Sequence, residues 1–355
     1  MRPVRCRTPR RTHSCRAPTG RLTTHTLTRT AVASLALASL ALSASVLAQE
    51  FTLTMGMSEA PDTPSHLAAQ RIAELADERS GGRLKIDVFP GGALGSVAST
   101  IEGVTTGTVD LYWGGISWYE KFHPDFKIFS IGWGFLDEDH MLRFMETEKF
   151  NEMKQALIDD RNLRMISHHG LRSPRILLST KPVFSPDDLA GLRVRVPDQP
   201  IYLRTWEAVG ASPVRIDYGE AYLAVRQGIA DALENPIEGL HGMAFYEVAS
   251  HVIYTNHLLN PYAVVVNEQR FQELGEELQA ILVQAALDGS TYYVEIRDEL
   301  EAKAKREMVA ADTSFTEINL RPFAERTREL ARELEAAGEW SPGLFDQVSE
   351  LADAD

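Results

Sequence analysis

Cysteine is almost absent from this chain, and its two copies lie close to one end. Cys6 and Cys15 both fall within the first 48 residues. Residues 49–355 therefore offer no disulfide, no thiolate nucleophile and no cysteine-ligated zinc. They also lack an apolar run of the roughly 20 residues that a membrane-spanning helix needs. The body of the chain has to fold around an apolar core without these aids.

Acidic residues are missing from the first 48 positions, where eight arginines occur instead. A short apolar run from Ala31 to Leu42 follows the basic part, and small residues lead up to Ala48. This order is typical of a secretory signal peptide, and it predicts a signal over 1–48 with cleavage after Ala48. The pair Arg10 and Arg11 leaves open an export route for folded proteins. Either route leads to the periplasm.

Positive charge is scarce after the signal. The whole chain has 36 basic and 50 acidic residues and a net charge of −14, and losing eight arginines makes the remainder more negative. Such a surface repels nucleic acid and anionic lipid, which excludes both as partners. An anionic ligand would need a local basic pocket.

Catalytic signatures are also missing. The sequence contains no GxSxG, HExxH or GxxxxGK[ST] motif, and Gly91–Gly95 is too short a match for a dinucleotide loop. His168 and His169 are adjacent on a predicted strand, where neighbouring side chains point to opposite faces and do not share a metal. We expect no catalytic residue, no cofactor and no metal.

Hydrophobic periodicity predicts an α/β protein of about two domains. Strands are expected at 51–57, 84–89, 109–113, 163–168, 175–179, 262–266 and near 315, and helices at 67–80, 97–106, 139–158, 276–308, 322–337 and 342–351. The early strand–helix–strand order favours a parallel sheet with right-handed crossovers. Ligands of such sheets gather at the carboxyl ends of the strands. Because no linker separates the domains, we expect the chain to cross between them more than once.

Short motifs occur in a fixed order along the chain: Pro90–Gly95, Gly107–Asp110, Pro186–Pro197, Gly210–Pro213, Gly219–Tyr222, Gln227–Asp231 and Glu234–Pro236. No single motif is specific, but the ordered set is. It resembles the DctP-type solute-binding proteins of the tripartite ATP-independent periplasmic (TRAP) transporters.

The resemblance implies a two-domain periplasmic-binding-protein clamshell, with α/β lobes, strands that cross between them and a long helix that braces both. The first lobe would comprise 49–172 plus 261–300. The second would comprise 173–260 plus 301–355, including the C-terminal helices. A ligand held in the cleft would bring the lobes together by a hinge motion.

Arg195 lies in the strand pattern Arg193-Val-Arg-Val, and by position it is similar to the family's principal carboxylate-binding arginine. A planar guanidinium offers two parallel N–H donors to a carboxylate, which gives a strong and orienting contact. The pattern alone also fits an arginine on the solvent face of the strand.

A second arginine of the family matches Arg175, with Arg172 as an alternative after a small register shift. Asn235 resembles the family's amide contact to the ligand, and its other interpretation is a helix cap before Pro236. Tyr218 lies where the family often packs an aromatic ring on the substrate. Core packing is the alternative for that ring.

Trp113 and Trp118 follow a predicted strand at the position of first-lobe pocket residues, although buried aromatics are common in cores too. Between them, Gly114 and Gly115 replace polar residues that some sugar-acid receptors have. This departure favours apolar walls and a less hydroxylated ligand, such as an aromatic, 2-oxo or 2-hydroxy monocarboxylate.

The function that the resemblance implies is capture of an organic acid in the periplasm and its delivery to the membrane subunits of a TRAP transporter. We expect a monomeric receptor and no enzymatic activity. Two alternatives are a secreted hydrolase or lyase that uses Glu220, Glu234 or a histidine as acid or base, and a solute sensor for a signalling partner.

Overall fold

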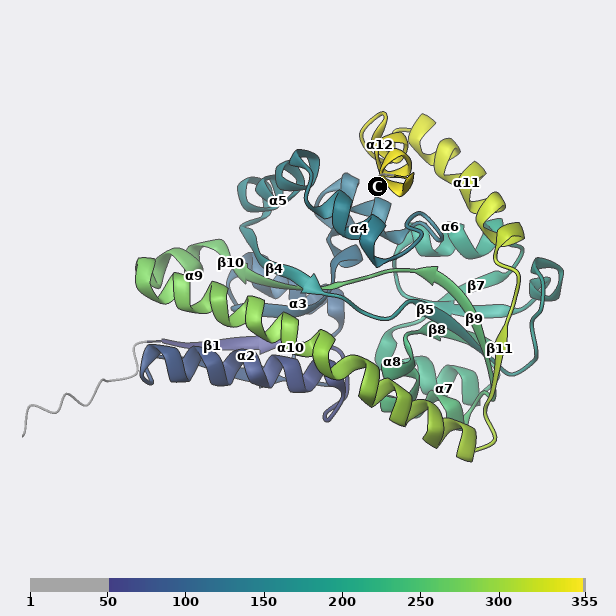
Figure 1. The fold of residues 1–355 in the computed structure, drawn as a ribbon, viewed down its shortest axis with the longest axis horizontal. Helices are drawn as coiled ribbons and strands as arrows, with labels where there is room; N and C mark the ends of the chain where they lie inside the picture. The colour runs from purple at the N-terminus through teal and green to yellow at the C-terminus, as the bar shows by residue number, and fades with distance from the viewer. Residues whose placement is uncertain (1–50, 354–355) are drawn as a thin grey trace, which may run out of the picture. The chain divides into compact units, whose positions relative to one another are not determined.

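The computed structural model describes residues 51–353, and the predicted signal peptide lies outside them. The described chain forms two mixed sheets with helices around them, which confirms the predicted α/β class (Figure 1). The first sheet has the order β2-β1-β3-β10-β4, with β1 (Phe51–Gly56), β2 (Leu84–Phe89), β3 (Leu111–Gly115), β4 (Leu163–Gly170) and β10 (Tyr262–Asn267). The second has the order β11-β9-β5-β8-β6-β7, with β5 (Arg175–Ser179), β6 (Arg193–Val196), β7 (Ser212–Arg215), β8 (Ala232–Asn235), β9 (His251–Leu258) and β11 (Ser314–Glu317).

Helices connect and cover these strands. The α-helices are α2 (Pro64–Ser80), α3 (Val97–Thr106), α4 (Glu138–Met145), α5 (Glu148–Arg161), α6 (Pro200–Ala208), α7 (Ala221–Arg226), α8 (Ile237–Gly242), α9 (Glu268–Glu273), α10 (Gly275–Ala310), α11 (Arg321–Ala336) and α12 (Leu344–Glu350). Short 3-10 helices are η1 (Ile116–Lys121), η2 (Pro124–Ser130), η3 (Pro186–Leu189), η4 (Tyr218–Glu220), η5 (Phe245–Glu247) and η6 (Leu351–Asp353). None of the helices between residues 51 and 353 has the length and apolar character to cross a membrane.

The chain passes between the two sheets several times. It leaves the first sheet after β4, enters the second at β5, and returns from β9 to β10. Helix α10 then packs against α2 beside the first sheet and against α8 beside the second (Figure 1). This arrangement matches the crossing strands and the long bracing helix that the sequence predicts.

The three early strands are parallel, as their strand–helix–strand order predicts. Strand β1 is parallel to both β2 and β3, but β10 is antiparallel to both β3 and β4. The early strand–helix–strand units account for the parallel part. Strand β10 runs the other way because it enters from the second sheet, which local sequence order does not reveal.

The single helix predicted over 139–158 is two helices in the structure. Helix α4 ends at Met145, and the Thr147 side chain accepts a hydrogen bond from the Phe150 amide, which caps the start of α5. A threonine in this position satisfies an amide that the first turn leaves without a partner. The apolar periodicity continues across the break, so the sequence pattern does not reveal it.

The two adjacent histidines of β4 do not point to opposite faces as predicted. The rings of His168 and His169 lie 4.1 Å apart between centroids. The pairing of β4 with β10 shifts register at this place, because Tyr262 pairs with Gly170 and Val264 pairs with Ser167. Such a bulge breaks the alternation of side chains. The described residues hold no group of three or more His, Cys, Asp or Glu suited to a metal.

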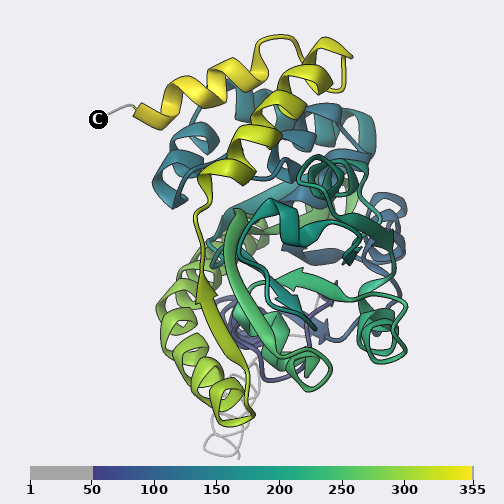
Figure 2. The ribbon, with the colours of Figure 1, turned by 90° about the vertical axis from the view of Figure 1, so that its right-hand side faces the viewer.

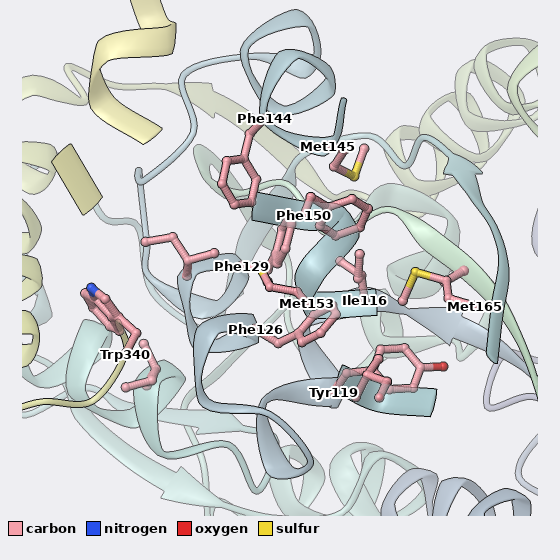
Figure 3. Packing of buried hydrophobic residues seen from close by; sticks show 14 of the residues in the cluster. Ile116, Tyr119, Phe126, Phe129, Phe144, Met145, Phe150, Met153, Met165 and Trp340 are labelled. Carbon is pink, nitrogen blue, oxygen red and sulfur yellow. The ribbon is translucent and has the colours of Figure 1, made fainter. Parts of the chain in front are cut away.

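The C-terminal helices close one side of the apolar core. Phe126, Phe129, Phe144 and Phe150 form a buried aromatic group, and apolar residues of α11 and α12 join the same cluster together with Trp340 (Figure 3). Helix α11 packs against α6, and α12 packs against η2; Figure 2 shows both C-terminal helices in yellow at the top of the view. The last part of the chain therefore packs against an earlier part of it.

Close packing of α10 on α2 requires a glycine at position 289. A Cβ atom built on Gly289 would lie 2.2 Å from Cγ1 of Ile72. Alanine normally stabilises a helix interior by about 0.5–1 kcal/mol over glycine. Here we expect Gly289→Ala to lower the free energy of unfolding by about 1–3 kcal/mol, because the added methyl overpacks the contact. Urea denaturation of the purified protein measures this change.

Removal of the opposing side chain provides the control. In an Ile72→Ala background the methyl of Gly289→Ala has room, so the double variant should lose less stability than the two single variants added together. If Gly289→Ala stabilised the otherwise unmodified protein, the close packing of position 289 against Ile72 would be contradicted.

Candidate functional site

The carboxyl ends of parallel strands from both sheets meet at a small buried cavity of about 40 Å³. Ser58 and Glu59 follow β1, Tyr112 and Gly115 belong to β3, and Trp118 lies in η1. From the second sheet come residues at or after the ends of β6, β7 and β8. The lining residues are Ser58, Glu59, Val97, Tyr112, Gly115, Trp118, Arg172, Arg175, Arg195, Pro197, Gln199, Tyr202, Tyr218, Asn235 and Asn260. This is the edge where α/β sheets bind ligands.

The small cavity adjoins a larger cleft of about 360 Å³. The cavity and the cleft have these lining residues in common: Ser58, Val97, Trp118, Arg195, Pro197 and Tyr218. Small-molecule sites usually occupy about 300–1,000 Å³. The inner cavity therefore suits one end of a ligand, and the outer cleft suits the remainder.

Arg175 is held by a buried carboxylate. Its Nε and Nη2 donate to the two carboxylate oxygens of Glu234, and His257 Nε2 lies 3.2 Å from the same carboxylate. Burial opposes both charges, but the two groups stabilise each other. As a result, the carboxylate raises the pKa of Arg175, and Arg175 with His257 lowers the pKa of Glu234 to about 2 despite its burial.

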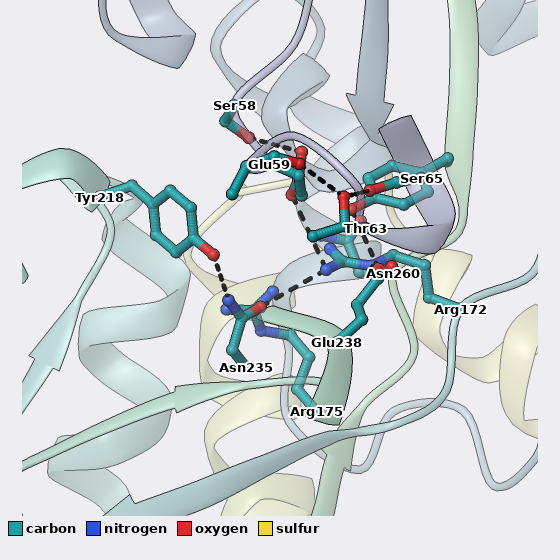
Figure 4. Close-up of polar contacts among 12 residues, drawn as sticks. Ser58, Glu59, Thr63, Ser65, Arg172, Arg175, Tyr218, Asn235, Glu238 and Asn260 are labelled. Atoms are coloured by element: carbon teal, nitrogen blue, oxygen red, sulfur yellow. Dashed lines mark hydrogen bonds and ion pairs between the residues drawn. The ribbon is translucent and has the colours of Figure 1, made fainter. Parts of the chain in front are cut away.

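Arg172 is also paired with acidic groups. Its Nε donates to Glu238 at 3.1 Å, and its Nη2 lies 3.8 Å from a carboxylate oxygen of Glu59 (Figure 4). The guanidinium stacks over the ring of Tyr262, 4.3 Å from its centroid. Burial works against this charge too, but the surrounding oxygens raise the pKa of Arg172 well above its usual value.

Arg195 has no such partner. Its side chain is buried, with 3% of the residue exposed, and its Nε donates to the Ile216 carbonyl at 2.8 Å. Within residues 51–353, no acidic side chain lies within 4.0 Å of this guanidinium. Burial lowers the pKa of Arg195 to about 10, and the nearby Arg175 acts in the same direction. The group remains a cation at neutral pH, and its other nitrogens are left for a ligand.

Tyr218 and Asn235 flank this cation. The Asn235 Nδ2 donates to the Tyr218 hydroxyl at 2.8 Å (Figure 4), and Arg195 lies 5.7 Å from the Tyr218 ring centroid. Arg172 Nη2 donates to Asn235 Oδ1 at 3.5 Å. No side chain caps α8, which begins after Pro236. Asn235 therefore belongs to the cavity network and does not act as the helix cap that the sequence left open.

Of the predicted site residues, Trp113 is the one that the structure does not bring to the cavity. Arg172, Arg175, Arg195, Tyr218, Asn235 and Trp118 all line it. Trp113 is fully buried with Tyr262 and Tyr293, and its indole nitrogen donates to the Ser65 carbonyl at 3.1 Å. It lies in the core that β3 shares with α2 and α10. The prediction for Trp113 is corrected here, because alternate residues of β3 face different sides.

The prediction of apolar walls rested on Gly114 and Gly115, and the structure shows which side chains occupy the space beside them. A Cβ on Gly115 would lie 2.5 Å from Asn260 Nδ2, and one on Gly114 would lie 2.4 Å from the Tyr112 ring. Gly114 makes room for the ring of Tyr112 on the same strand, and Gly115 makes room for the amide of Asn260 from elsewhere in the chain. The Asn260 amide oxygen accepts from the Ser117 amide at 3.0 Å. The cavity is thus polar where the sequence suggested an apolar surface.

Sequence reasoning missed several lining residues, among them Ser58, Glu59, Tyr112, Gln199, Tyr202 and Asn260. Ser58 and Glu59 directly follow β1, so the rule for strand ends could have identified them. Asn260 lies just before β10, in a strand connection that no sequence pattern links to the cavity.

The family profile for bacterial extracellular solute-binding protein, family 7, matches residues 55–337 of this chain. The chain belongs to this family. A solute-binding protein of Roseobacter denitrificans is 29% identical over 78% of this chain and 84% of its own length. The 2,3-diketo-L-gulonate-binding periplasmic protein of Escherichia coli is 27% identical over 82% of this chain and 88% of its own.

A solved structure indicates the same kind of protein. The crystal structure of a TRAP periplasmic solute-binding protein from Roseobacter denitrificans, with bound L-galactonate, matches with a TM-score of 0.78 and 28% identity over 85% of this chain and 99% of that one. Family 7 membership makes the chain a solute-binding protein of the TRAP type, as the motif order predicts.

For this family 7 protein, the Arg175–Glu234 pair should govern stability in acid. The pKa of Glu234 is lowered from 4.5 to about 2, so its contribution is present above about pH 4.5 and is lost as the pH falls towards 2. A shift of this size corresponds to about 3 kcal/mol. Glu234→Gln should cost about 3–5 kcal/mol at neutral pH, because it leaves a buried cation with a poorer partner.

Urea denaturation at several pH values between 7 and 3 measures both effects. The difference in unfolding free energy between the unmodified protein and Glu234→Gln should shrink as the pH falls below 4.5. A difference that stays constant over this range would rule out the proposed linkage.

The tryptophans of β3 and η1 should differ in their effect on stability. Trp113→Phe removes a buried indole and its hydrogen bond, so we expect a loss of about 2–4 kcal/mol. Trp118→Phe, at a partly exposed position, should change stability by less than about 1 kcal/mol. Denaturation curves for the two variants test the contrast, and equal losses would place both rings in the core.

Proposed function

We propose that this protein captures a hydroxylated organic acid through its carboxylate and delivers it to the membrane subunits of a TRAP transporter. The observation that carries the proposal is the buried Arg195, which has no acidic partner within residues 51–353. A buried ion is stable only when it is paired or well hydrogen-bonded. A ligand carboxylate supplies the missing counter-charge.

The surrounding groups would orient the rest of the molecule. Arg195 presents its free nitrogens to the carboxylate, and Arg175 adds a second cation that Glu234 keeps in place. The Asn235 amide and the Tyr218 hydroxyl are already bonded to each other and face the same cavity. Arg172, which Asn235 also contacts, holds this network from the other side. Trp118 offers an apolar face at the junction with the outer cleft.

Ligand binding would favour a closed form because its contacts come from both sheets. A ligand shifts the equilibrium only by its difference in affinity between open and closed forms. We propose that the lobes comprise 49–172 plus 261–300 and 173–260 plus 301–355, with Arg172 beside a crossing segment between them. The monomeric receptor, exported to the periplasm by the signal over 1–48, would then present its closed form to the transporter.

The polar lining favours a ligand with several hydroxyl groups. The relatives named above are described with 2,3-diketo-L-gulonate and L-galactonate, which are acids of this kind. Glu59, Gln199 and Asn260 offer carboxylate and amide groups for hydroxyls. A sugar acid therefore replaces the aromatic or 2-oxo acid that the glycines suggested.

Binding without turnover is part of the proposal. Glu234, one of the residues considered as an acid or base, is occupied by Arg175, which with His257 keeps the carboxylate ionised. Burial lowers the pKa of His257, although Glu234 opposes that shift. Glu220 lies in the outer cleft. Glu234 and His257 are thus engaged in the ion-pair network around Arg175.

Arg195→Ala should weaken binding of the acid at least tenfold, since truncating one partner of a buried charge pair costs about 2–5 kcal/mol. A thermal-shift screen of aldonic and uronic acids identifies the ligand, and calorimetry then compares the variants. Because Arg195 is unpaired, its removal should leave the ligand-free protein about as stable as before.

Arg193→Ala is the matched control. Arg193 lies two residues earlier on the same strand but is exposed and paired with Asp231 at 2.7 Å. Its loss removes the same charge and should leave affinity within about twofold. Equal affinity of Arg195→Ala and the unmodified protein would refute the assignment of the carboxylate contact.

A further inference from the structure

The buried charges around the cavity balance one another before any ligand arrives. Three arginines line it, and three glutamates lie against them: Arg172, Arg175, Arg195, Glu59, Glu234 and Glu238. Glu234 pairs with Arg175, while Glu59 and Glu238 both face Arg172. A ligand with one negative charge would make this cluster singly negative, and a second charge would have no cation to meet.

Glu59 is the glutamate that lines the cavity itself. It is buried, with 5% of the residue exposed, and its carboxylate accepts a hydrogen bond from the Ser58 hydroxyl at 2.9 Å. Its contact with Arg172 is long, at 3.8 Å, because Glu238 holds the closer position at 3.1 Å. The Glu59 carboxylate is therefore only partly neutralised. Glu59 follows the first-sheet strand β1, whereas Arg195 belongs to β6 of the second sheet.

Within residues 51–353, the lining of the outer cleft adds no basic side chain to Arg195, and the cations Lys121 and Arg215 next to it face Asp198. The acidic lining residues of the cleft are Asp198, Asp217 and Glu220, and among the described residues Arg195 is the one basic side chain that lines it. Asp198 is already paired with Lys121 at 2.8 Å. A ligand anchored at Arg195 thus extends towards carboxylates along either path.

We infer that Glu59 makes this receptor selective for singly charged hydroxy acids, by accepting hydrogen bonds from hydroxyl groups and repelling a second carboxylate. The inference rests on the proposed function, and it names the class of acid. A carboxylate accepts hydrogen bonds well but donates none when ionised. A hydroxyl group near Glu59 gains a strong acceptor, whereas a carboxylate in its place meets like charge in a site shielded from water.

A matched pair of ligands tests this selectivity. L-galactonate and galactarate share one carbon skeleton and differ at one end, where the first has a CH₂OH group and the second a carboxylate. Calorimetry with the unmodified protein should give at least about 100-fold tighter binding of galactonate, since like charges in an interface cost several kcal/mol. Gluconate and glucarate form a second pair for the case in which the stereochemistry of galactonate does not fit.

Glu59→Gln then assigns the selectivity to one residue. The amide keeps the size of the side chain and removes its charge, so the ratio between the two acids should fall at least about tenfold. Glu59→Asp retains the charge and should keep the preference for the monoacid. Glu102→Gln, an exposed change on α3, removes the same net charge and should leave the ratio unaltered.

The outcomes separate the two proposals. Equal binding of galactonate and galactarate to the unmodified protein overturns the selectivity and leaves the carboxylate receptor standing. A ratio that Glu59→Gln does not change overturns the role of Glu59. Failure of every monoacid to bind refutes the proposed function and the inference with it. The ratio of the affinities for galactonate and galactarate is measured first on the unmodified protein. Misfolding of Glu59→Gln would therefore not prevent this test of the selectivity.

Discussion

A buried guanidinium without an acidic partner is the constraint on which the site depends. Arg195 is removed from water by β6, by Pro197 and by the ring of Tyr218, and its contact within the described protein is the carbonyl of Ile216. The free energy of such a charge is unfavourable until an anion arrives. The nearby carboxylate of Glu234 does not act as the direct partner of Arg195, because Glu234 is ion-paired with Arg175. Recognition of an anion thus gives Arg195 the direct counter-charge that no acidic side chain of residues 51–353 provides.

The same network links the site to the parts of the chain that pass between the sheets. Arg172 lies between β4 and β5, and Asn260 lies between β9 and β10. Arg172 reaches Glu238 on α8, whose carboxylate also accepts a hydrogen bond from Tyr293 on α10 at 2.9 Å. Ligand contacts in the cavity are therefore connected, through two hydrogen bonds, to the long helix that packs against both sheets. A change in the distance between the sheets would alter this connection directly.

Much of the fold could be predicted because its causes are local. The strand over 84–89, the helix over 97–106 and the strand over 175–179 have the predicted limits, since short apolar periods and turn residues define them. Arg195, Arg175 and Asn235 were found by motif order, and they do line one cavity. Local patterns gave no answer, or a wrong one, where a distant segment decides the result. Strand β10 runs antiparallel because of its origin in the other sheet, and the bulge at His168 depends on its pairing with β10.

The sequence by itself determined the chemistry available to the protein, its fold class and its family. The chain has no cysteine after residue 48, it has an α/β pattern, and its ordered family motifs indicated a solute receptor. Only the tertiary structure decided which side chains surround the ligand. Trp113, in the middle of β3, enters the core, whereas Glu59, just after β1 of the same sheet, enters the cavity. Gly115 has no side chain, but the space beside it is polar because the amide of Asn260, 145 positions later, fills it. Such contacts join residues far apart in sequence, so no local pattern contains them.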